Sequence, residues 1–174
     1  NNISTVFILT RHNLHAEYII KALSAGKNVI VEKPLAMNYN ELEAIRTEYE
    51  KAGKGLMLGF NRRFSTLTLK MIQLITREQK KSINIRINAG AVPPDHWVHD
   101  PEIGGGRIIG EVCHFIDLAG FIAGSRAKNI HAFALSTNSA KNDTVTINIE
   151  YQNGSIASIC YFSNGNSNIP KERV

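Results

Sequence analysis

The sequence predicts an α/β fold in which a parallel sheet comes first along the chain and a second group of strands follows it. Over residues 5–60, apolar segments have the lengths and periods of a strand, a helix, a strand, a helix and a strand. Because βαβ crossovers are right-handed, this order places the three strands in one parallel sheet. After residue 64, alternating apolar and polar residues and an Asn153-Gly154 turn indicate further strands.

The first predicted strand, residues 5–10, is apolar on both faces, as a central parallel strand would be. A helix follows from Asn13, whose side chain can cap the free backbone N–H groups, and runs to about residue 25. Gly26 stands where a left-handed residue would end that helix.

A second strand is predicted at residues 28–32 and a third at residues 55–60. Between them, Asn38 and Glu41 have the spacing of a capping box, so a helix begins there and Gly53 ends it. These elements complete a βαβαβ unit.

The second part of the chain combines helices, strands and one long loop. Ser65 can cap its first helix, and Gly124 ends the second. The loop of residues 91–105 is rich in aromatic and ionisable residues, and loops of this length in a compact domain are usually functional or disordered. The predicted elements are helices at 65–76 and 107–122 and strands at 83–89, 128–137, 144–151 and 155–163.

The composition of the 174 residues excludes several classes of protein. Apolar residues at 43% and charged residues at 20% are ordinary globular usage. The net charge of +5 is scattered, and its densest group, Arg77, Lys80 and Lys81, fits a solvated helix end better than a nucleic-acid site. Cys113 and Cys160 fit a reduced compartment. No apolar run approaches the roughly 20 residues that span a bilayer, so we expect a cytoplasmic protein without membrane or nucleic-acid partners.

Lys33 is the first candidate for chemistry. It follows the strand at residues 28–32, and ligands of open α/β sheets bind outside the carboxyl ends of the strands. A lysine there can polarise or deprotonate a substrate hydroxyl. Pro34 fits a tight turn at such a crevice. The alternative is a surface lysine at the end of a strand.

His114 is the second candidate. It follows Gly104-Gly105-Gly106, and glycines let a backbone approach a ligand closely. Regular helical spacing would put Glu111 and His114 on one face, with Asp117 one step further along. A neutral imidazole there could act as general base. The alternative is a hydrogen-bonded core histidine.

A metal centre is a rival interpretation of the same region. His96 and His99 in the loop, together with Glu111 and His114, could supply nitrogen and oxygen ligands to zinc. A loop enforces no geometry on the first two, and the cysteines show no paired spacing.

Several motifs in order resemble one known family over nearly the whole chain. They are Ala22-Leu23-x-Ala25-Gly26-Lys27-x-Val29 before Glu32-Lys33-Pro34, then Gly59-Phe60-Asn61-Arg62-Arg63-Phe64, then Gly104-Gly105-Gly106 with His114 and Asp117. This set resembles the glucose–fructose oxidoreductase, inositol dehydrogenase and rhizopine catabolism (Gfo/Idh/MocA) family of NAD(P)-dependent oxidoreductases. The resemblance implies part of a Rossmann dinucleotide-binding domain at residues 1–63 and part of an α/β domain with an open, mostly antiparallel sheet at residues 64–174.

The resemblance also implies a reaction, hydride transfer between NAD or NADP and a sugar, nucleotide-sugar or cyclitol hydroxyl. Lys33 would orient the substrate hydroxyl and the nicotinamide, and His114 would be the acid/base. The implied cofactor-binding residues are Thr10, Arg11, His12, His15, Glu32, Lys33 and Pro34. Further candidates for substrate contacts are Arg63, Asp95, Trp97 and Glu111. The open sheet would join copies into a homo-oligomer, and a non-catalytic assembly module that keeps this sheet is the alternative.

Two departures from the family pattern affect these expectations. The family often has an Asp four residues before the histidine, where this chain has Gly110 followed by Glu111. Glu111 could take over part of that role, although a shift of one residue turns it about 100° around a helix. No Gly-x-Gly-x-x-Gly occurs in the chain, and this motif holds the dinucleotide pyrophosphate. We therefore expect an incomplete and inactive fragment.

Overall fold

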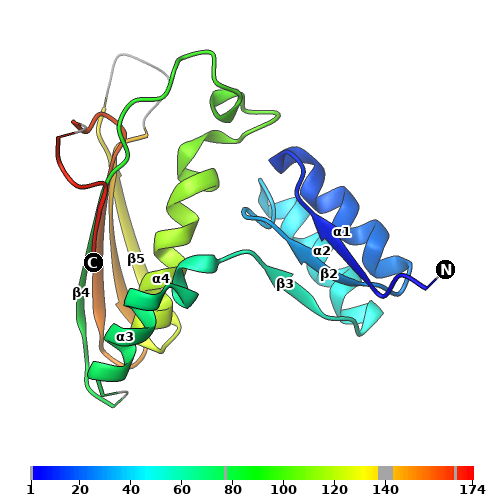
Figure 1. Cartoon of the computed structure of the whole chain (residues 1–174), viewed down its shortest axis with the longest axis horizontal. Helices are drawn as coiled ribbons and strands as arrows, with labels where there is room; N and C mark the ends of the chain where they lie inside the picture. Colours follow the sequence, from blue (N-terminus) through cyan, green and yellow to red (C-terminus); the bar gives the residue numbers. More distant parts are fainter. Residues whose placement is uncertain (1, 77, 137–142, 167) are drawn as a thin grey trace. The chain divides into compact units, whose positions relative to one another are not determined.

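The computed structural model describes residues 2–76, 78–136, 143–166 and 168–174 (Figure 1). Contacts group the chain into two compact units, the first with Asn1–Phe60 and Trp97–Cys113 and the second with Asn61–His96 and His114–Val174. The predicted domains, 1–63 and 64–174, divide the chain differently, because residues 97–113 make their contacts within the first unit. Arg77 and residue 137, which two predictions included, lie outside the described residues.

A three-stranded parallel sheet forms the centre of the first unit. Its strands are β1 (Thr5–Ile8), β2 (Asn28–Val31) and β3 (Leu56–Leu58), in the order β1-β2-β3. Both pairings are parallel, which confirms the predicted βαβαβ unit. Each strand is shorter than its predicted range, because the chain leaves the ladder after Ile8, Val31 and Leu58.

Helices α1 (His15–Ser24) and α2 (Tyr39–Ala52) pack on one face of this sheet (Figure 1). Burial of each large aliphatic side chain contributes about 1.5–3 kcal/mol, so this layer is the main source of stability in the unit. The fully buried core residues are Ile8, Ala16, Ile19, Ala22, Leu23, Val29, Val31 and Ile45.

The predicted start of the first helix at Asn13 is wrong. A 3-10 turn, η1 (His12–Leu14), precedes α1, and the N-cap of α1 is Leu14, without a side-chain hydrogen bond. The backbone N–H of Asn13 instead donates to the carbonyl oxygen of Ile103 at 3.3 Å. A long-range contact therefore replaces the local cap. Gly26 does end the helix region with a φ of +70°.

The capping prediction for α2 is confirmed. The Asn38 side chain accepts a hydrogen bond from the backbone N–H of Glu41 at 2.9 Å. The Glu41 carboxylate reaches back to the backbone N–H of Met37 at 2.8 Å. Gly53 ends the helix in the left-handed conformation, with a φ of +58°, as predicted.

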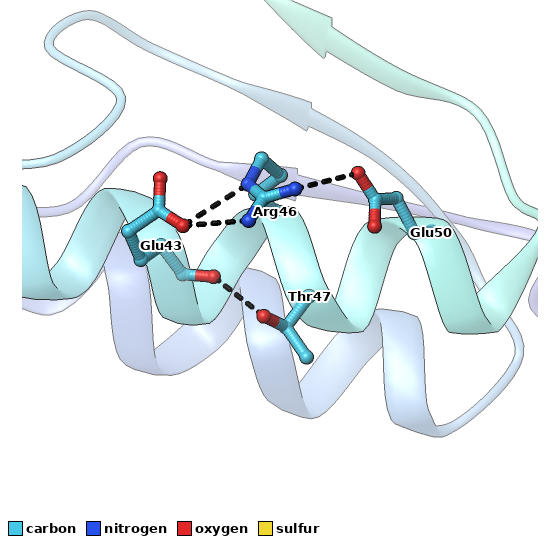
Figure 2. Close-up of polar contacts among 4 residues, drawn as sticks. All are labelled: Glu43, Arg46, Thr47 and Glu50. Atoms are coloured by element: carbon cyan, nitrogen blue, oxygen red, sulfur yellow. Dashed lines mark hydrogen bonds and ion pairs between the residues drawn. The ribbon is translucent and has the colours of Figure 1, made fainter.

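The exposed side of α2 carries a local network of polar contacts (Figure 2). Arg46 donates to Glu43 at 2.7 Å and to Glu50 at 3.0 Å, and the Thr47 hydroxyl donates to the carbonyl oxygen of Glu43 at 2.9 Å. The hydrogen bond from Arg46 holds the pKa of Glu43 below its usual value. Because these groups are largely exposed to solvent, water screens their attraction and the pairs stabilise the fold little.

The second unit is built on a five-stranded sheet in the order β5-β6-β7-β4-β8. Its strands are β4 (Ser82–Asn88), β5 (Ala127–Ala134), β6 (Val145–Tyr151), β7 (Ile156–Phe162) and β8 (Glu172–Arg173). Only β4 and β7 pair in parallel, and the other neighbours are antiparallel. The predicted open, mostly antiparallel sheet is therefore confirmed.

Helices α3 (Thr66–Leu74) and α4 (Cys113–Ala123) lie along one face of that sheet (Figure 1). Ser65 caps α3 by accepting a hydrogen bond from the backbone N–H of Thr68 at 3.2 Å, as predicted. Alternate residues of the strands point into the core, including Ile83, Ile85, Ile87, Val145, Ile147, Ile149, Ala157, Ile159 and Tyr161.

Two turns shape the edge of the second unit. Gly154, with a φ of +82°, closes the predicted hairpin between β6 and β7, and Gly124, with a φ of +65°, follows α4.

Every residue of β5 is exposed, and Ile130 and Phe133 retain 57% and 71% of their surface. Within the described ranges, no helix combines the length and apolarity needed to cross a membrane.

Candidate active site

Lys33 lies directly after β2, at the carboxyl end of the parallel sheet. Its Nζ donates a hydrogen bond to the carbonyl oxygen of Gly110 at 2.7 Å. The Lys33–Pro34 peptide bond is cis. The preceding Glu32 is exposed, and its carboxylate lies against Gly59, where an added Cβ would approach it to 3.2 Å. The ammonium group is thus held by a backbone carbonyl and not by a carboxylate.

His15 fixes the loops that follow β1 and β2. Its ring is fully buried, with Nδ1 2.7 Å from the carbonyl oxygen of Pro34 and Nε2 3.2 Å from that of Thr10. Both partners can only accept hydrogen, so the shorter contact places a hydrogen on Nδ1. His15, which the family resemblance predicts to bind the cofactor, thus connects the loops that follow β1 and β2.

His12 is held on several sides within the same unit. Its Nδ1 lies 2.8 Å from the carbonyl oxygen of Gly104, and its ring meets the edge of Trp97 with centroids 4.8 Å apart. Burial lowers the pKa of His12 below the usual value, the hydrogen bond to Gly104 raises it in part, and the charge of Lys33 lowers it further. Burial and the charge of Lys33 thus favour the neutral imidazole.

Arg11, which is exposed, and Trp97, which is half-buried, lie at the border of this group. The Arg11 guanidinium lies 4.1 Å from the centre of the Trp97 ring, a cation–π arrangement. Thr10 next to it is exposed. Thr10, Arg11 and His12 thus stand together at the end of β1, with Trp97 as a neighbour.

The three glycines at residues 104–106 let the backbone pack closely against other parts of the same chain. A Cβ on Gly104 would lie 2.5 Å from the backbone of Trp97 and Val98, so no side chain fits there. Gly105 and Gly106 adopt φ values of +70° and +85°, which favour glycine. These glycines were predicted to let the backbone approach a ligand. In the structure, Gly104 instead lies close to the backbone of Trp97 and Val98.

A π-helical turn, η4 (Ile108–Val112), interrupts the predicted helix at residues 107–122 before α4 begins. The expectation that Glu111 and His114 share a helical face assumed regular α-helical spacing, which this turn does not have. Glu111 instead accepts a hydrogen bond from the buried Arg107 at 3.2 Å. Its carboxylate is therefore engaged by an arginine of the same turn. Turns of this kind occur frequently at functional sites.

His114 belongs to the second unit, near the start of α4. In that unit Arg63 makes a bidentate pair with Asp117, with a distance of 3.0 Å from Nε to Oδ2. The Arg63 guanidinium also lies 5.3 Å from the ring centre of Phe121. Arg63, predicted as a substrate contact, thus links the segment that follows β3 to helix α4 through its pair with Asp117.

Within the described residues, the remaining candidates do not form a metal-binding group. Asp95 and His96 are exposed in the loop. Among the residues that the structure describes, no group of three or more His, Cys, Asp or Glu side chains could hold a metal ion. The zinc interpretation of His96, His99, Glu111 and His114 therefore gains no support.

Sequence reasoning identified Gly110 only as a departure from the family pattern and gave Arg107 no role. Gly110 accepts the hydrogen bond of Lys33, and Arg107 is 2% exposed beside Glu111. Each left a signal: a glycine inside a helical pattern often marks a close packing contact, and Arg107 and Glu111 have the spacing of a helical ion pair.

Comparison with known protein families gives two matches. Residues 1–60 match a model described as an oxidoreductase family with an NAD-binding Rossmann fold. Residues 79–169 match the GFO/IDH/MocA C-terminal domain. Both matches agree with the predicted fold of their part of the chain.

Individual relatives match over most of this chain. The myo-inositol 2-dehydrogenase of Thermotoga maritima is 28% identical over 134 residues, which cover 75% of this chain and 39% of the relative. The D-xylose 1-dehydrogenase (NADP(+)) 2 of Haloferax volcanii is 27% identical over 163 residues, covering 91% and 50%. The crystal structure of an NAD-binding protein from Listeria innocua has a TM-score of 0.80 and 28% identity, covering 99% of this chain and 52% of that one. The chain thus spans about half of their length or less.

Proposed function

The chain belongs to the GFO/IDH/MocA family of oxidoreductases, and on that premise we propose that the protein transfers hydride between a hydroxyl-bearing carbon and NAD or NADP. The proposed substrate is a sugar, nucleotide sugar or cyclitol, because the relatives include proteins named for myo-inositol and D-xylose. The observation that carries the proposal is Lys33, held by Gly110 at the carboxyl end of β2.

Lys33 is proposed to bind the reacting hydroxyl. A lysine ammonium has three hydrogens to donate, and Gly110 takes one of them. The remaining two can bind a substrate oxygen. In the oxidation direction, negative charge develops on that oxygen as hydride leaves its carbon. A fixed positive charge beside it stabilises the transition state more than the ground state.

His114 is proposed as the acid/base. In oxidation it would accept the hydroxyl proton while hydride leaves the same carbon, which turns the alcohol into a carbonyl. In the reverse direction it would return the proton to the oxygen. An imidazole suits both directions, because its ordinary pKa lies near neutral pH.

The residues present fit one end of a dinucleotide. Thr10, Arg11 and His12 bring a hydroxyl, a guanidinium and a neutral imidazole to the end of β1, which suits the hydroxyls and amide of a nicotinamide riboside. When bound, the nicotinamide ring supplies the carbon that accepts or donates hydride. The phosphate-binding motif Gly-x-Gly-x-x-Gly does not occur in these 174 residues, so the residues proposed here account for the nicotinamide end alone.

The four residues predicted to contact the substrate continue as proposals, three of them in changed form. Trp97 makes a cation–π contact with Arg11 and an edge contact with His12. These contacts support a position beside the cofactor more than a direct contact with the substrate. Asp95, exposed in the loop, remains a proposed substrate contact. Glu111 and Arg63 are engaged by Arg107 and Asp117, and we propose structural roles for both.

We also propose that copies of the protein associate through the sheet of the second unit. The exposed apolar side chains of β5, Ile130 and Phe133, support this interface, since large exposed apolar residues on a sheet edge favour association. Phe133→Asp should then shift the protein to a smaller species in light scattering. The same exposed edge favours the second candidate function, a non-catalytic assembly module, which predicts association without turnover.

The test of the reaction uses the protein expressed from its natural gene. It is assayed for NAD- and NADP-dependent oxidation of myo-inositol, D-xylose and related polyols. Lys33→Ala and His114→Ala should each lower kcat/KM by about 10²-fold or more, with an unchanged melting temperature. The matched control is Lys21→Ala, on the exposed side of α1, which should keep full turnover. Near-normal turnover in either site variant would contradict its assigned role.

A further inference from the structure

The side-chain space of residue 110 is occupied by a different residue. A Cβ built on Gly110 would lie 2.8 Å from Cε1 of His12 and 3.5 Å from its Nδ1. The first distance is shorter than real side chains tolerate. The His12 ring cannot easily move away, because Gly104 and Trp97 hold it. Histidine at position 12 therefore requires glycine at position 110.

Lys33 also contacts Gly110. Its Nζ donates to the carbonyl oxygen of Gly110, while the His12 ring packs against the Cα of Gly110. Lys33 follows β2 and His12 follows β1, so the two side chains come from adjacent parallel strands. The positive charge of Lys33 is close enough to lower the pKa of His12. An ammonium and an imidazole thus stand beside one glycine.

The partners of His12 fix its tautomer. The carbonyl oxygen of Gly104 can only accept, so Nδ1 carries the hydrogen. A neutral ring then has its lone pair on Nε2. Within the ranges that the structure describes, the contact with Gly104 is the one hydrogen bond of this side chain. The other charged or titratable groups that act on the ring are Lys33, His15 and Arg11, and none of them is an acid.

We propose that His12 supplies the second hydrogen-bonding group beside Lys33, with Nε2 accepting a hydrogen bond from a polyol hydroxyl next to Gly110. The hydroxyl belongs either to the sugar or cyclitol substrate or to the nicotinamide ribose, which present the same chemistry. The choice of ligand rests on the proposed hydride transfer, whereas the pairing of His12 with Gly110 does not. In this role His12 takes the place that the sequence analysis considered for Glu111, whose carboxylate pairs with Arg107.

The first test is a double-mutant cycle on stability. Gly110→Ala should lower the Tm by roughly 5 °C or more, as expected for an overpacked core position. In the His12→Ala background the same change should have little effect, because the methyl group then has room. Additive shifts in Tm would overturn the pairing. Gly120→Ala is the matched control, because a Cβ there meets no atom within 4 Å.

The second test asks which hydroxyl Nε2 accepts. In protein labelled with ¹⁵N-histidine, the Nε2 resonance of His12 is followed on addition of NADH alone and of myo-inositol alone, then of each with the other present. A shift with NADH alone assigns the ribose, and a shift that requires myo-inositol assigns the substrate. If no addition moved the resonance while other signals showed that the ligands bind, the acceptor role would be refuted.

The third test moves the acceptor. His12→Ala should lower kcat/KM by about 10- to 100-fold. The double variant His12→Ala/Gly110→Asp should recover part of that loss, because it returns an acceptor to the same space. Gly110→Asp alone should be destabilised by the His12 ring. Equal turnover in His12→Ala and the natural protein would contradict the proposal. Absence of polyol turnover in the natural protein would reject the hydride-transfer function, and the stability cycle and NMR titration would still decide the role of His12.

Discussion

Two polar groups in the first unit differ in how the sequence builds them. On α2, Glu43, Arg46 and Glu50 stand three and four residues apart and pair in solvent (Figure 2). Around Lys33, the partners come from separate segments: the end of β1, the end of β2 and residues 97–113. The first group follows from helical spacing. The second exists only once the chain has folded.

The two groups also differ in how much their side chains are exposed to water. The α2 pairs lose little when broken, because solvent replaces each partner. His15 is fully buried and meets two carbonyl oxygens, and a buried polar group that loses its partner bears the full cost of desolvation. Substitutions should therefore separate the two groups clearly, in the order that follows.

His15→Ala should have the largest effect on stability. It removes a buried ring, which leaves a cavity, and it deprives the carbonyl oxygen of Pro34 of its hydrogen-bond donor. We expect the free energy of unfolding to fall by about 2–4 kcal/mol in urea titrations. His131→Ala, on the exposed strand β5, is the control for loss of one histidine. Equal effects of the two changes would remove the distinction drawn here.

Tyr151→Phe tests the same rule in the second unit, with the opposite sign. Tyr151 is buried, and the described residues offer its hydroxyl no hydrogen-bond partner. Burial raises its pKa to about 12. Removing the hydroxyl should leave the free energy of unfolding unchanged or raise it by about 1 kcal/mol. Tyr49→Phe, on the exposed side of α2, should change nothing. A clear loss of stability in Tyr151→Phe would mean that the hydroxyl has a partner.

Arg46→Ala should have the smallest effect. Both residues are good helix formers, and the lost pairs are exposed, so the urea midpoint should stay within error. The local signature is a rise in the pKa of Glu43 toward its ordinary value, because the hydrogen bond from Arg46 that lowers it is gone. That lowered pKa stabilises the fold only above the ordinary carboxyl pKa, and the contribution is lost as the pH falls. An NMR titration of Glu43 measures the shift, and a large drop in the urea midpoint would contradict the expectation.

The sequence predicted what depends on local spacing. The strand and helix order, the Asn38–Glu41 cap and the left-handed Gly26, Gly53 and Gly154 all follow from rules within a few residues. It failed where distant contacts decide the local conformation. Asn13 does not cap α1, because its backbone bonds to Ile103, 90 positions further along.

The candidate site shows the same division. The position of Lys33 at a strand end followed from the strand pattern. Gly110 was identified only as a departure from the family pattern, and its contact with Lys33 could not be predicted, because the two residues lie 77 positions apart. The π-helical turn Ile108–Val112 also defeated the helical-face argument for Glu111, since that argument assumes a constant number of residues per turn.

The chain crosses between the two units after Phe60, after His96 and after Cys113, and this connectivity matters for how the protein folds during synthesis. The three parallel strands and both helices of the first unit lie within residues 5–58, so a ribosome releases them before residues 97–113. The carbonyl groups that receive His12, Asn13 and Lys33 emerge only with Ile103, Gly104 and Gly110. Between the two, α3 and β4 of the other unit leave the ribosome. The first unit therefore cannot complete the surroundings of its lysine until residues 97–113 have been synthesised, and a nascent chain that ends before Gly110 should hold the sheet and helices with the end of β2 still open.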